Sequence, residues 1–546
     1  MSDRANVRHD AVVVGAGFSG LYMLHRLRES GFSVRVFEAG TDVGGTWYWN
    51  RYPGARCDIE SMEYSYSFDP ALQQEWEWTE RFAGQPEILR YIEHVADRFD
   101  LRRDITFETR VVKATFDEAA CRWRIETGAG EIVEAKALVM ATGCLSSANL
   151  PEFEGRNSFL GETYHTGRWP HGHVDFGGKR VGIIGTGSSA IQAIPIIAVE
   201  SEHLTVFQRT PNYSVPARNG PLDPGYVREI KAEYPEFRVR NRLMPAGFGS
   251  KGLGRNDVSA LSDDAAARGA RFAERWEHGG FGFLGAYNDL LFNRDANETA
   301  ADFVRGQIRE TVKDPEVAER LCPDNVIGCK RICLDTRYYE TYNQPNVELL
   351  AAGTHPIERI TPAGVLVNVL NPETGEQEGC REISLDCIVF ATGFDAMTGA
   401  VLGVDISGRG GRTLPDAWSA GPRTYLGLGT AGFPNLFMIT GPGSPSVLTN
   451  MVVAIEQHVD WIGDCLENLR REKLATIEAT PEAQDAWVEH VNSVADKTLM
   501  PTCNSWYLGR NIPGKPQVFM PLIGFPPYAE KCAEVAANGY DGFELR

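Results

Sequence analysis

Residues 10–30 read DAVVVGAGFSGLYMLHRLRES, and this stretch decides the fold. A short apolar run typical of a buried strand is followed by the helical spacing of apolar residues in LYMLHRLRES. Between them, Gly15, Gly17 and Gly20 match G-x-G-x-x-G, in which glycines allow a tight turn, a close pyrophosphate and close helix packing. The next apolar run, SVRVFEAG, ends at Glu38, where a carboxylate can bind both hydroxyls of a ribose. The stretch predicts a strand, turn and helix that bind a dinucleotide.

A second unit of the same kind begins at residue 180 with RVGIIG, followed by the helical SSAIQAIPIIA. Gly185 and Gly187 belong to a G-x-G-x-x-A variant, and Gln208 and Arg209 stand where the first unit has its acid. An acid would repel a 2′-phosphate, whereas arginine can pair with one, so this unit is predicted to bind NADPH rather than NADH. Lys330 is a candidate second phosphate ligand, with a solvated surface lysine as an equal alternative.

The domain organisation follows from these two units. FAD is favoured for the first, because a unit near the N-terminus that returns to much later Ala-Thr-Gly strands, ending at 143 and 393, suits a long dinucleotide. Residues 223–322 are charged, alanine-rich and helical in pattern. We therefore predict an α/β fold of two Rossmann-like dinucleotide-binding domains, for FAD and NADPH, with a helical insertion. The expected boundaries are 1–145 and 390–546 for a discontinuous FAD domain, 150–222 and 325–389 for the NADPH domain, and 223–324 for the insertion.

The composition of the chain limits the classes of molecule that it is expected to bind. The chain has 546 residues, enough for several domains, and 54 basic against 73 acidic residues give a net charge of −19. This charge disfavours nucleic acid and anionic membranes as partners, and no obligate protein partner is evident. The eleven cysteines are scattered singly with no CxxC pair, no metal site is expected, and the N-terminus lacks a signal-peptide pattern. These features favour a cytoplasmic enzyme.

A longer sequence pattern indicates a class of reaction. Phe159, Gly161, His165, Trp169 and Pro170 form F-x-G-x-x-x-H-x-x-x-W-P just before the second glycine turn. This pattern resembles the signature of the type I Baeyer-Villiger monooxygenases. GGTWYWNRYPGARCD at 44–58 and CKRICLDTRYYETYN at 329–343 are similar to two further family segments, and the C-terminal part is similar to the branch of phenylacetone and steroid monooxygenases. The likeness covers almost the whole chain and departs at LIGFPPY, 522–528, where relatives tend to carry paired glycines.

The resemblance implies a reaction and a catalytic pair. NADPH reduces FAD, the reduced flavin captures O2, and a flavin peroxide inserts one oxygen atom next to a ketone carbonyl to give an ester or lactone. Arg331 would supply positive charge beside the reacting oxygen, Asp58 would hold that arginine, and His165 would couple the two domains. Hydrophobic aryl, cyclic or larger ketones are the implied substrates, with sulfides as a further class. The alternative is an N- or S-oxygenating flavin-containing monooxygenase, against which Trp169 and Pro170 argue.

The same matching assigns the remaining site residues. The FAD contacts are Thr46, Trp47, Tyr64, Val111 and Met451; the NADP contacts are Ser188, Ser189, Gln192, Thr210 and Trp506; the substrate contacts are Leu145, Val447, Leu448, Trp506 and Met520. Asp58 and Arg331 are also expected to bind cofactor, beside Arg209 and Lys330 at the second unit. For the buried aromatic and apolar members, an ordinary place in the core is the alternative.

Overall fold

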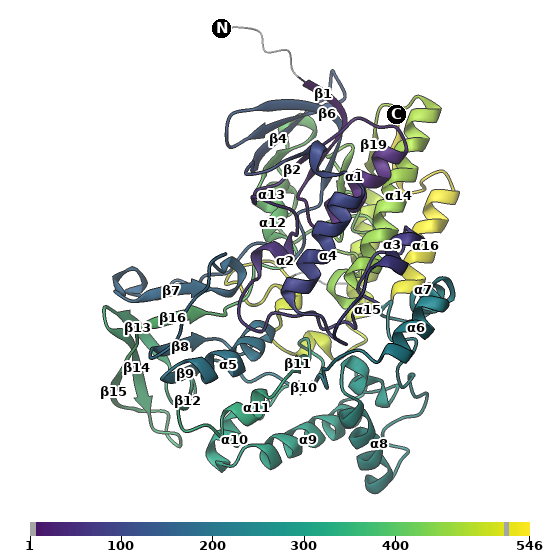
Figure 1. The fold of residues 1–546 in the computed structure, drawn as a ribbon. Helices are drawn as coiled ribbons and strands as arrows, with labels where there is room; N and C mark the ends of the chain where they lie inside the picture. Colours follow the sequence, from purple (N-terminus) through teal and green to yellow (C-terminus); the bar gives the residue numbers. More distant parts are fainter. Residues whose placement is uncertain (1–6, 518–523) are drawn as a thin grey trace.

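Residues 10–30 form the strand, turn and helix that their pattern predicts. The computed structural model describes residues 7–517 and 524–546 and has the α/β fold expected from the sequence, with one large mixed sheet and a separate parallel sheet (Figure 1). Strand β1 (Val7–Val14) leads through the glycine turn into helix α1 (Phe18–Glu29), and β2 (Val34–Phe37) ends directly before Glu38.

The first sheet has the strand order β17-β4-β5-β6-β1-β2-β3, with β18 paired to β6. Strand β1 lies between β2 and β6 and runs parallel to both, which places Val14 opposite Phe37 and Met140. The other strands are β3 (Ile105–Thr106), β4 (Val111–Asp117), β5 (Arg122–Thr127), β6 (Ile132–Met140), β17 (Asp405–Ser407) and β18 (Leu436–Met438). Because β17 and β18 come from the last third of the chain, the chain returns to its first sheet after building the second.

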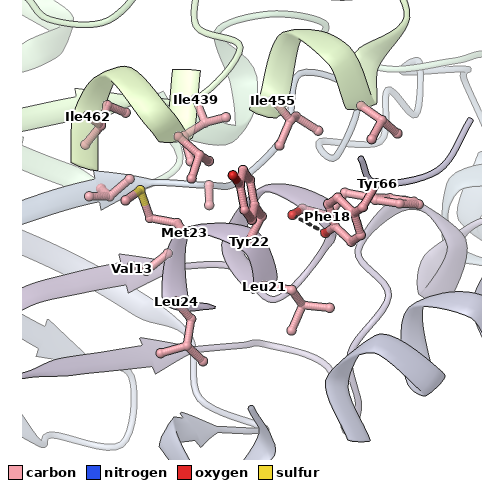
Figure 2. Packing of buried hydrophobic residues seen from close by; sticks show 14 of the residues in the cluster. Val13, Phe18, Leu21, Tyr22, Met23, Leu24, Tyr66, Ile439, Ile455 and Ile462 are labelled. Carbon is pink, nitrogen blue, oxygen red and sulfur yellow. Dashed lines mark hydrogen bonds between the residues drawn. The ribbon is translucent and has the colours of Figure 1, made fainter. Parts of the chain in front are cut away.

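Helix α1 is buried between this sheet and helix α14 (Met451–Glu472) (Figure 2). Leu21, Tyr22, Met23 and Leu24 are all less than one-tenth exposed, and burial of such apolar surface is the main force that holds the layers together. The first turn of α1 is fixed by the Tyr66 hydroxyl, which donates a hydrogen bond of 2.5 Å to the carbonyl oxygen of Phe18.

The second sheet has the order β12-β9-β8-β16-β7, and all its pairs are parallel. Its elements are β7 (Glu162–His165), β8 (Arg180–Ile184), α5 (Ser188–Glu200), β9 (His203–Gln208), β12 (Val347–Ala351) and β16 (Cys387–Phe390). An antiparallel sheet of β13 (Ile357–Thr361), β14 (Gly364–Leu370) and β15 (Gln377–Ser384) extends from it at the lower left of Figure 1.

The insertion is helical, as its composition predicts. It contains α6 (Pro224–Ala232), α7 (Tyr234–Leu243), α8 (Ala265–His278), α9 (Arg294–Thr311) and α10 (Pro315–Leu321), with the short turn η4 (Phe281–Ala286). Strands β10 (Ser214–Pro216) and β11 (Cys333–Asp335) bracket it and pair with each other, so the chain leaves and re-enters at one place. Val304 and Ile308 of α9 bury its apolar face against the core of the second sheet.

Smaller elements complete the fold. They are α2 (Thr46–Trp49), α3 (Pro70–Glu75), α4 (Gln85–Arg98), α11 (Tyr338–Thr341), α12 (Gly399–Leu402), α13 (Leu414–Ala417), α15 (Pro481–Ala495), α16 (Phe525–Ala537), β19 (Ile477–Ala479), β20 (Phe543–Leu545), and the short turns η1 (Arg102–Asp104), η2 (Arg156–Ser158), η3 (Thr166–Arg168), η5 (Arg409–Gly411), η6 (Ser446–Leu448), η7 (Met500–Thr502) and η8 (Trp506–Leu508). Among residues 7–517 and 524–546, no helix combines the length and the apolar character needed to cross a bilayer.

One feature differs from what the cysteine pattern suggests. Cys329 and Cys503 form a disulfide with a Cα–Cα distance of 6.1 Å, although 174 residues separate them. Scattered single cysteines gave no sign of this pair, because only the tertiary fold brings the two segments together. The other nine cysteines are free.

Candidate functional site

One cleft of about 1680 Å³ is lined by both glycine turns and by the segments that connect the two sheets. The connecting segments pair with each other, since the backbone N–H of Asn149 donates to the carbonyl oxygen of Gly393 at 2.9 Å. Every cofactor-binding residue predicted from the sequence lines this cleft except Gly20. The sequence therefore identified the wall of a single site rather than scattered positions.

The first glycine turn leaves no room for side chains. Gly15 has φ +105°, and a Cβ there would lie 2.6 Å from the carbonyl oxygen of Ala141. A Cβ on Gly20 would lie 1.8 Å from the carbonyl oxygen of Gly15, so Gly20 serves helix packing behind the cleft. A Cβ on Gly17 would meet the Cα of Gly45 at 3.1 Å. This cradle fits a pyrophosphate held against the N-terminus of α1.

Glu38 is buried beside this turn. Its two carboxylate oxygens accept hydrogen bonds from the backbone N–H groups of Ala16 and Gly40, both at 2.7 Å. Burial raises the pKa of Glu38, and these backbone donors act in the opposite direction. The carboxylate is thus fixed in place at the cleft wall, where the ribose of a dinucleotide is expected.

The wall beyond this turn suits a large ring system. Trp47 donates from its indole Nε1 to the Tyr64 hydroxyl at 3.3 Å, and Gln85 Nε2 donates to the carbonyl oxygen of Trp47 at 2.5 Å. Burial holds the pKa of Tyr64 well above its usual range, so this hydroxyl stays protonated. Thr46, Val111 and Met451 complete this wall.

The second glycine turn is built in the same way but faces open space. Gly185 has φ +122°, and a Cβ there would lie 2.4 Å from the carbonyl oxygen of Ala391. A Cβ on Gly187, in contrast, would meet no atom within 4 Å. Ser188, Ser189 and Thr210 line the cleft around it. This turn fits a second pyrophosphate that is less enclosed than the first.

Two cations follow the second turn. Arg209 is exposed, Lys330 is half-buried, and both line the cleft. Burial and the charge of Arg209 lower the pKa of Lys330, and the charge of Asp324 acts in the opposite direction. Neither forms a salt bridge with any residue that the structure describes. Such a pair is suited to a dianionic phosphate.

Gln192 lies at the junction of the two halves, although its predicted role is only an NADP contact. Its side-chain oxygen accepts from the Tyr52 hydroxyl at 2.7 Å, and its Nε2 donates to the carbonyl oxygen of Arg56 at 3.2 Å. Since Tyr52 and Arg56 precede Asp58 in one loop, Gln192 connects helix α5 to the loop that carries Asp58.

Arg331 and Asp58 form a two-pronged ion pair at the centre of the cleft. Nε of Arg331 donates to Oδ2 of Asp58 at 2.7 Å, and Nη2 donates to Oδ1 at 2.9 Å. Nη1 donates to the carbonyl oxygen of Val447 at 2.7 Å, and the guanidinium stands 4.8 Å from the ring centre of Phe281. Burial alone would lower the pKa of Arg331, but Asp58 and Tyr507 outweigh it and raise the pKa above its usual value. The arginine is permanently charged and fixed in orientation.

The signature segment joins the two connections between the sheets. Nδ1 of His165 accepts from the backbone N–H of Gly167 at 2.9 Å, so its Nε2 carries the proton and donates to the carbonyl oxygen of Asn149 at 3.1 Å. Thr392, on the other connection, lies 3.3 Å from the same nitrogen. Burial lowers the pKa of His165, which keeps the ring neutral. Trp169 lines the cleft, whereas Phe159, Gly161 and Pro170 do not.

An apolar cluster forms the end of the cleft beside Arg331. Leu145, Val447, Leu448 and Trp506 belong to it, together with the set Cys144, Ala396, Met397, Met451, Met500 and Tyr507. Leu448 packs in this cluster without lining the cleft. Met520 and the first part of the LIGFPPY departure lie outside the described residues, while Phe525 begins helix α16.

Several residues of the site were not found from the sequence. Phe281, Gln85 and Tyr507 contact Trp47 or Arg331, yet each comes from a distant segment with no motif of its own. Only the aromatic character of Phe281 in a glycine-rich stretch was a usable signal. Within residues 7–517 and 524–546, no group of three or more His, Cys, Asp or Glu side chains could hold a metal ion.

Comparison with known proteins agrees with this geometry. Residues 12–236 match the family described as pyridine nucleotide-disulphide oxidoreductase. A Baeyer-Villiger monooxygenase of Pseudooceanicola batsensis is 43% identical over 97% of this chain and 95% of its own length. A phenazine N-monooxygenase of Lysobacter antibioticus is 42% identical over 100% and 98%. A solved structure of an oxidized steroid monooxygenase bound to NADP is 52% identical, covers 99% of both chains and superposes with a TM-score of 0.92.

Proposed function

This chain belongs to the type I Baeyer-Villiger monooxygenases, an FAD- and NADPH-dependent family of ketone-oxygenating flavoproteins, and from this premise we propose which of its residues perform which part of the reaction. When bound, FAD accepts a hydride from NADPH and activates O2 for transfer of one oxygen atom to the substrate. The protein's task is then to hold two dinucleotides and a ketone in one cleft and to stabilise developing negative charge.

Arg331 carries the charge-stabilising role. The observation that supports it is the hydrogen-bonded arrangement of Arg331 with Asp58 and the Val447 carbonyl oxygen, which fixes a permanent cation where both glycine turns face the same cleft. A fixed cation stabilises negative charge on a reacting oxygen without the cost of reorganisation. Asp58 is a positioning residue, since both of its oxygens are occupied by Arg331.

The second turn holds NADPH. Gly187 leaves space for the pyrophosphate, and Arg209 with Lys330 supplies two positive charges for the 2′-phosphate that distinguishes NADPH from NADH. Glu38 on the first turn holds the ribose of FAD. His165 acts through the backbone of Asn149 and not as an acid or base, because both of its ring nitrogens are engaged by backbone groups.

The substrate is a ketone with a hydrophobic body. Leu145, Val447 and Trp506 surround the space beside Arg331 with apolar surface, which favours aryl, cyclic or larger ketones over small polar ones. The same wall would accept an organic sulfide. We assign the chain a cytoplasmic location, where NADPH is available, and the domain boundaries set out above.

Oxygenation of a ring nitrogen is the second candidate. The phenazine N-monooxygenase relative is as similar to this chain as the Baeyer-Villiger relative, so the fold accommodates both activities. The cation at Arg331 suits the tetrahedral oxyanion of a ketone adduct, which has no counterpart in N-oxidation, and this favours the ketone.

The test is product analysis with labelled oxygen. Purified holoenzyme is given NADPH, ¹⁸O2 and a panel of linear, cyclic, aryl and steroid ketones, an aryl sulfide and a phenazine. We expect an ester or lactone that carries one ¹⁸O atom from a hydrophobic ketone. N-oxide formation with every ketone untouched would overturn the ketone assignment.

A further inference from the structure

The Cys329–Cys503 disulfide joins two irregular segments beside the cleft. Residues 322–332 run from α10 to β11 with no helix or strand, and they include Lys330 and Arg331. The segment 503–515 has only the short turn η8, which carries Trp506 and Tyr507. Residues 322–332 are also held by the Asn297 side chain, which exchanges two hydrogen bonds with the backbone of Ile327, and by the Arg331–Asp58 pair. The segment 503–515 has no sheet or long helix to fix it, so the covalent bond is a restraint mainly on this second segment.

The two cysteines stand directly next to the cleft wall. Lys330, which follows Cys329, and Asn504, which follows Cys503, both line the cleft. Cys329 is fully buried, and its sulfur accepts a hydrogen bond from Asn325 Nδ2 at 3.2 Å. Cys503 is half-buried, so solvent reaches the pair on the Cys503 side.

A second contact, beside the proposed catalytic arginine, joins the same two segments as the disulfide. Tyr507 is buried and interacts with Arg331 across the same two segments. At its far end the segment is held by Asn511 Nδ2, which donates to the carbonyl oxygen of Phe394 at 2.8 Å, and by Lys515, whose Nζ donates to the carbonyl oxygen of Ala396 at 2.6 Å. The disulfide holds the same segment at its other end, before Trp506 in the chain.

We propose that Cys329 and Cys503 form an oxidative modification site, at which hydrogen peroxide makes a bond that fixes Trp506 and Tyr507 against Arg331. In the step, both thiols lose a proton and the pair loses two electrons; the O–O bond of the peroxide breaks and two water molecules form. A dithiol reverses the step by becoming a disulfide itself. Oxidised protein holds the oxygenating geometry, and reduced protein lets the segment move away from Arg331. The effect on catalysis rests on the proposed roles of Arg331 and Trp506.

Chemical mapping tests the site without using activity. Holoenzyme is reduced with dithiothreitol, freed of reductant, and treated with hydrogen peroxide; peptides are then analysed by mass spectrometry, and proteolysis within 503–515 is timed. We expect a peptide linking Cys329 to Cys503 only after peroxide, with cleavage about tenfold slower than in the reduced protein, because opening is restrained. Absence of the linked peptide, or equal cleavage rates, would overturn the proposal.

The catalytic consequence is measured as ester formed per NADPH consumed. We expect this ratio, measured at saturating NADPH, to fall about tenfold on reduction and to recover with peroxide. Cys503→Ser should behave as permanently reduced. Cys380→Ser, which changes an exposed cysteine on β15, should still switch. If the linked peptide is found but the ratio is the same in oxidised and reduced protein, the proposal is overturned. If the linked peptide is found but no ester forms in either state, the result counts against the proposed function alone.

Discussion

The two glycine turns use the same backbone device in opposite surroundings. Gly15 packs against the carbonyl oxygen of Ala141, and Gly185 packs against that of Ala391, each with a positive φ. The first turn is closed by the backbone of Gly45 and by a buried carboxylate, Glu38. The second opens at Gly187 toward two cations. The difference indicates that one dinucleotide stays enclosed during turnover, while the other, marked by its phosphate, binds and leaves.

The largest expected effect is at Gly20, behind the first turn, where the second unit has Ala190. In Gly20→Ala, the new Cβ would lie 1.8 Å from the carbonyl oxygen of Gly15, and we expect a loss of about 3 kcal/mol in the free energy of unfolding together with loss of yellow FAD. Gly187→Ala is the matched control, since its Cβ meets nothing within 4 Å: it should retain FAD and stability and bind NADPH more weakly. Thermal unfolding and flavin absorbance measure both. Equal destabilisation of the two variants would contradict the difference in packing between Gly20 and Gly187.

The next largest effect concerns the Asp58–Arg331 ion pair in the cleft. Asp58→Ala frees Arg331 to leave its position, and we expect initial rates of ester formation to fall about a hundredfold with folding retained. Because the two residues act as one unit, Asp58→Ala combined with Arg331→Ala should be scarcely slower than Arg331→Ala alone. If the double variant instead loses activity by the product of the two single losses, Asp58 has a separate role.

A smaller effect tests whether the second glycine turn binds the 2′-phosphate of NADPH. Arg209→Ala removes one charge-assisted contact to the 2′-phosphate, worth about 1.5 kcal/mol or roughly tenfold, so KM for NADPH should rise while KM for NADH stays constant. Steady-state kinetics with both reductants measure this. An unchanged ratio of the two KM values would remove Arg209 from phosphate binding.

The smallest expected effect is a change in KM for NADPH with pH. Burial and Arg209 lower the pKa of Lys330, so its charge is lost at a lower pH than that of an ordinary lysine while Arg209 stays charged. KM for NADPH should therefore rise by a few-fold on the alkaline side, with KM for NADH flat. Lys330→Arg keeps the charge and should remove this rise; the same alkaline profile in both proteins would place Lys330 outside the phosphate site.

Local sequence predicted most of what the backbone does. The glycine turns, Glu38, Arg209 and the helical insertion follow from spacing and composition, because each depends on residues close together in the chain. The Arg331–Asp58 pair required a family resemblance, since 273 residues separate its members. Phe281 under Arg331, the bridge of Gln192 to Tyr52, and the Cys329–Cys503 bond come from packing between distant segments, which no local pattern encodes. Leu448 was assigned to the substrate contacts by the family resemblance, and it packs in the apolar cluster without lining the cleft.

One measurement tests the central claim that reduction and oxygenation are separable at Arg331. Arg331→Ala holoenzyme is mixed with NADPH under nitrogen to record flavin bleaching, and then assayed in air with an accepted ketone. We predict that bleaching by NADPH persists at a measurable rate while ester formation nearly vanishes, because only oxygenation develops the negative charge that the guanidinium stabilises. Ester formation at the wild-type rate would contradict the account.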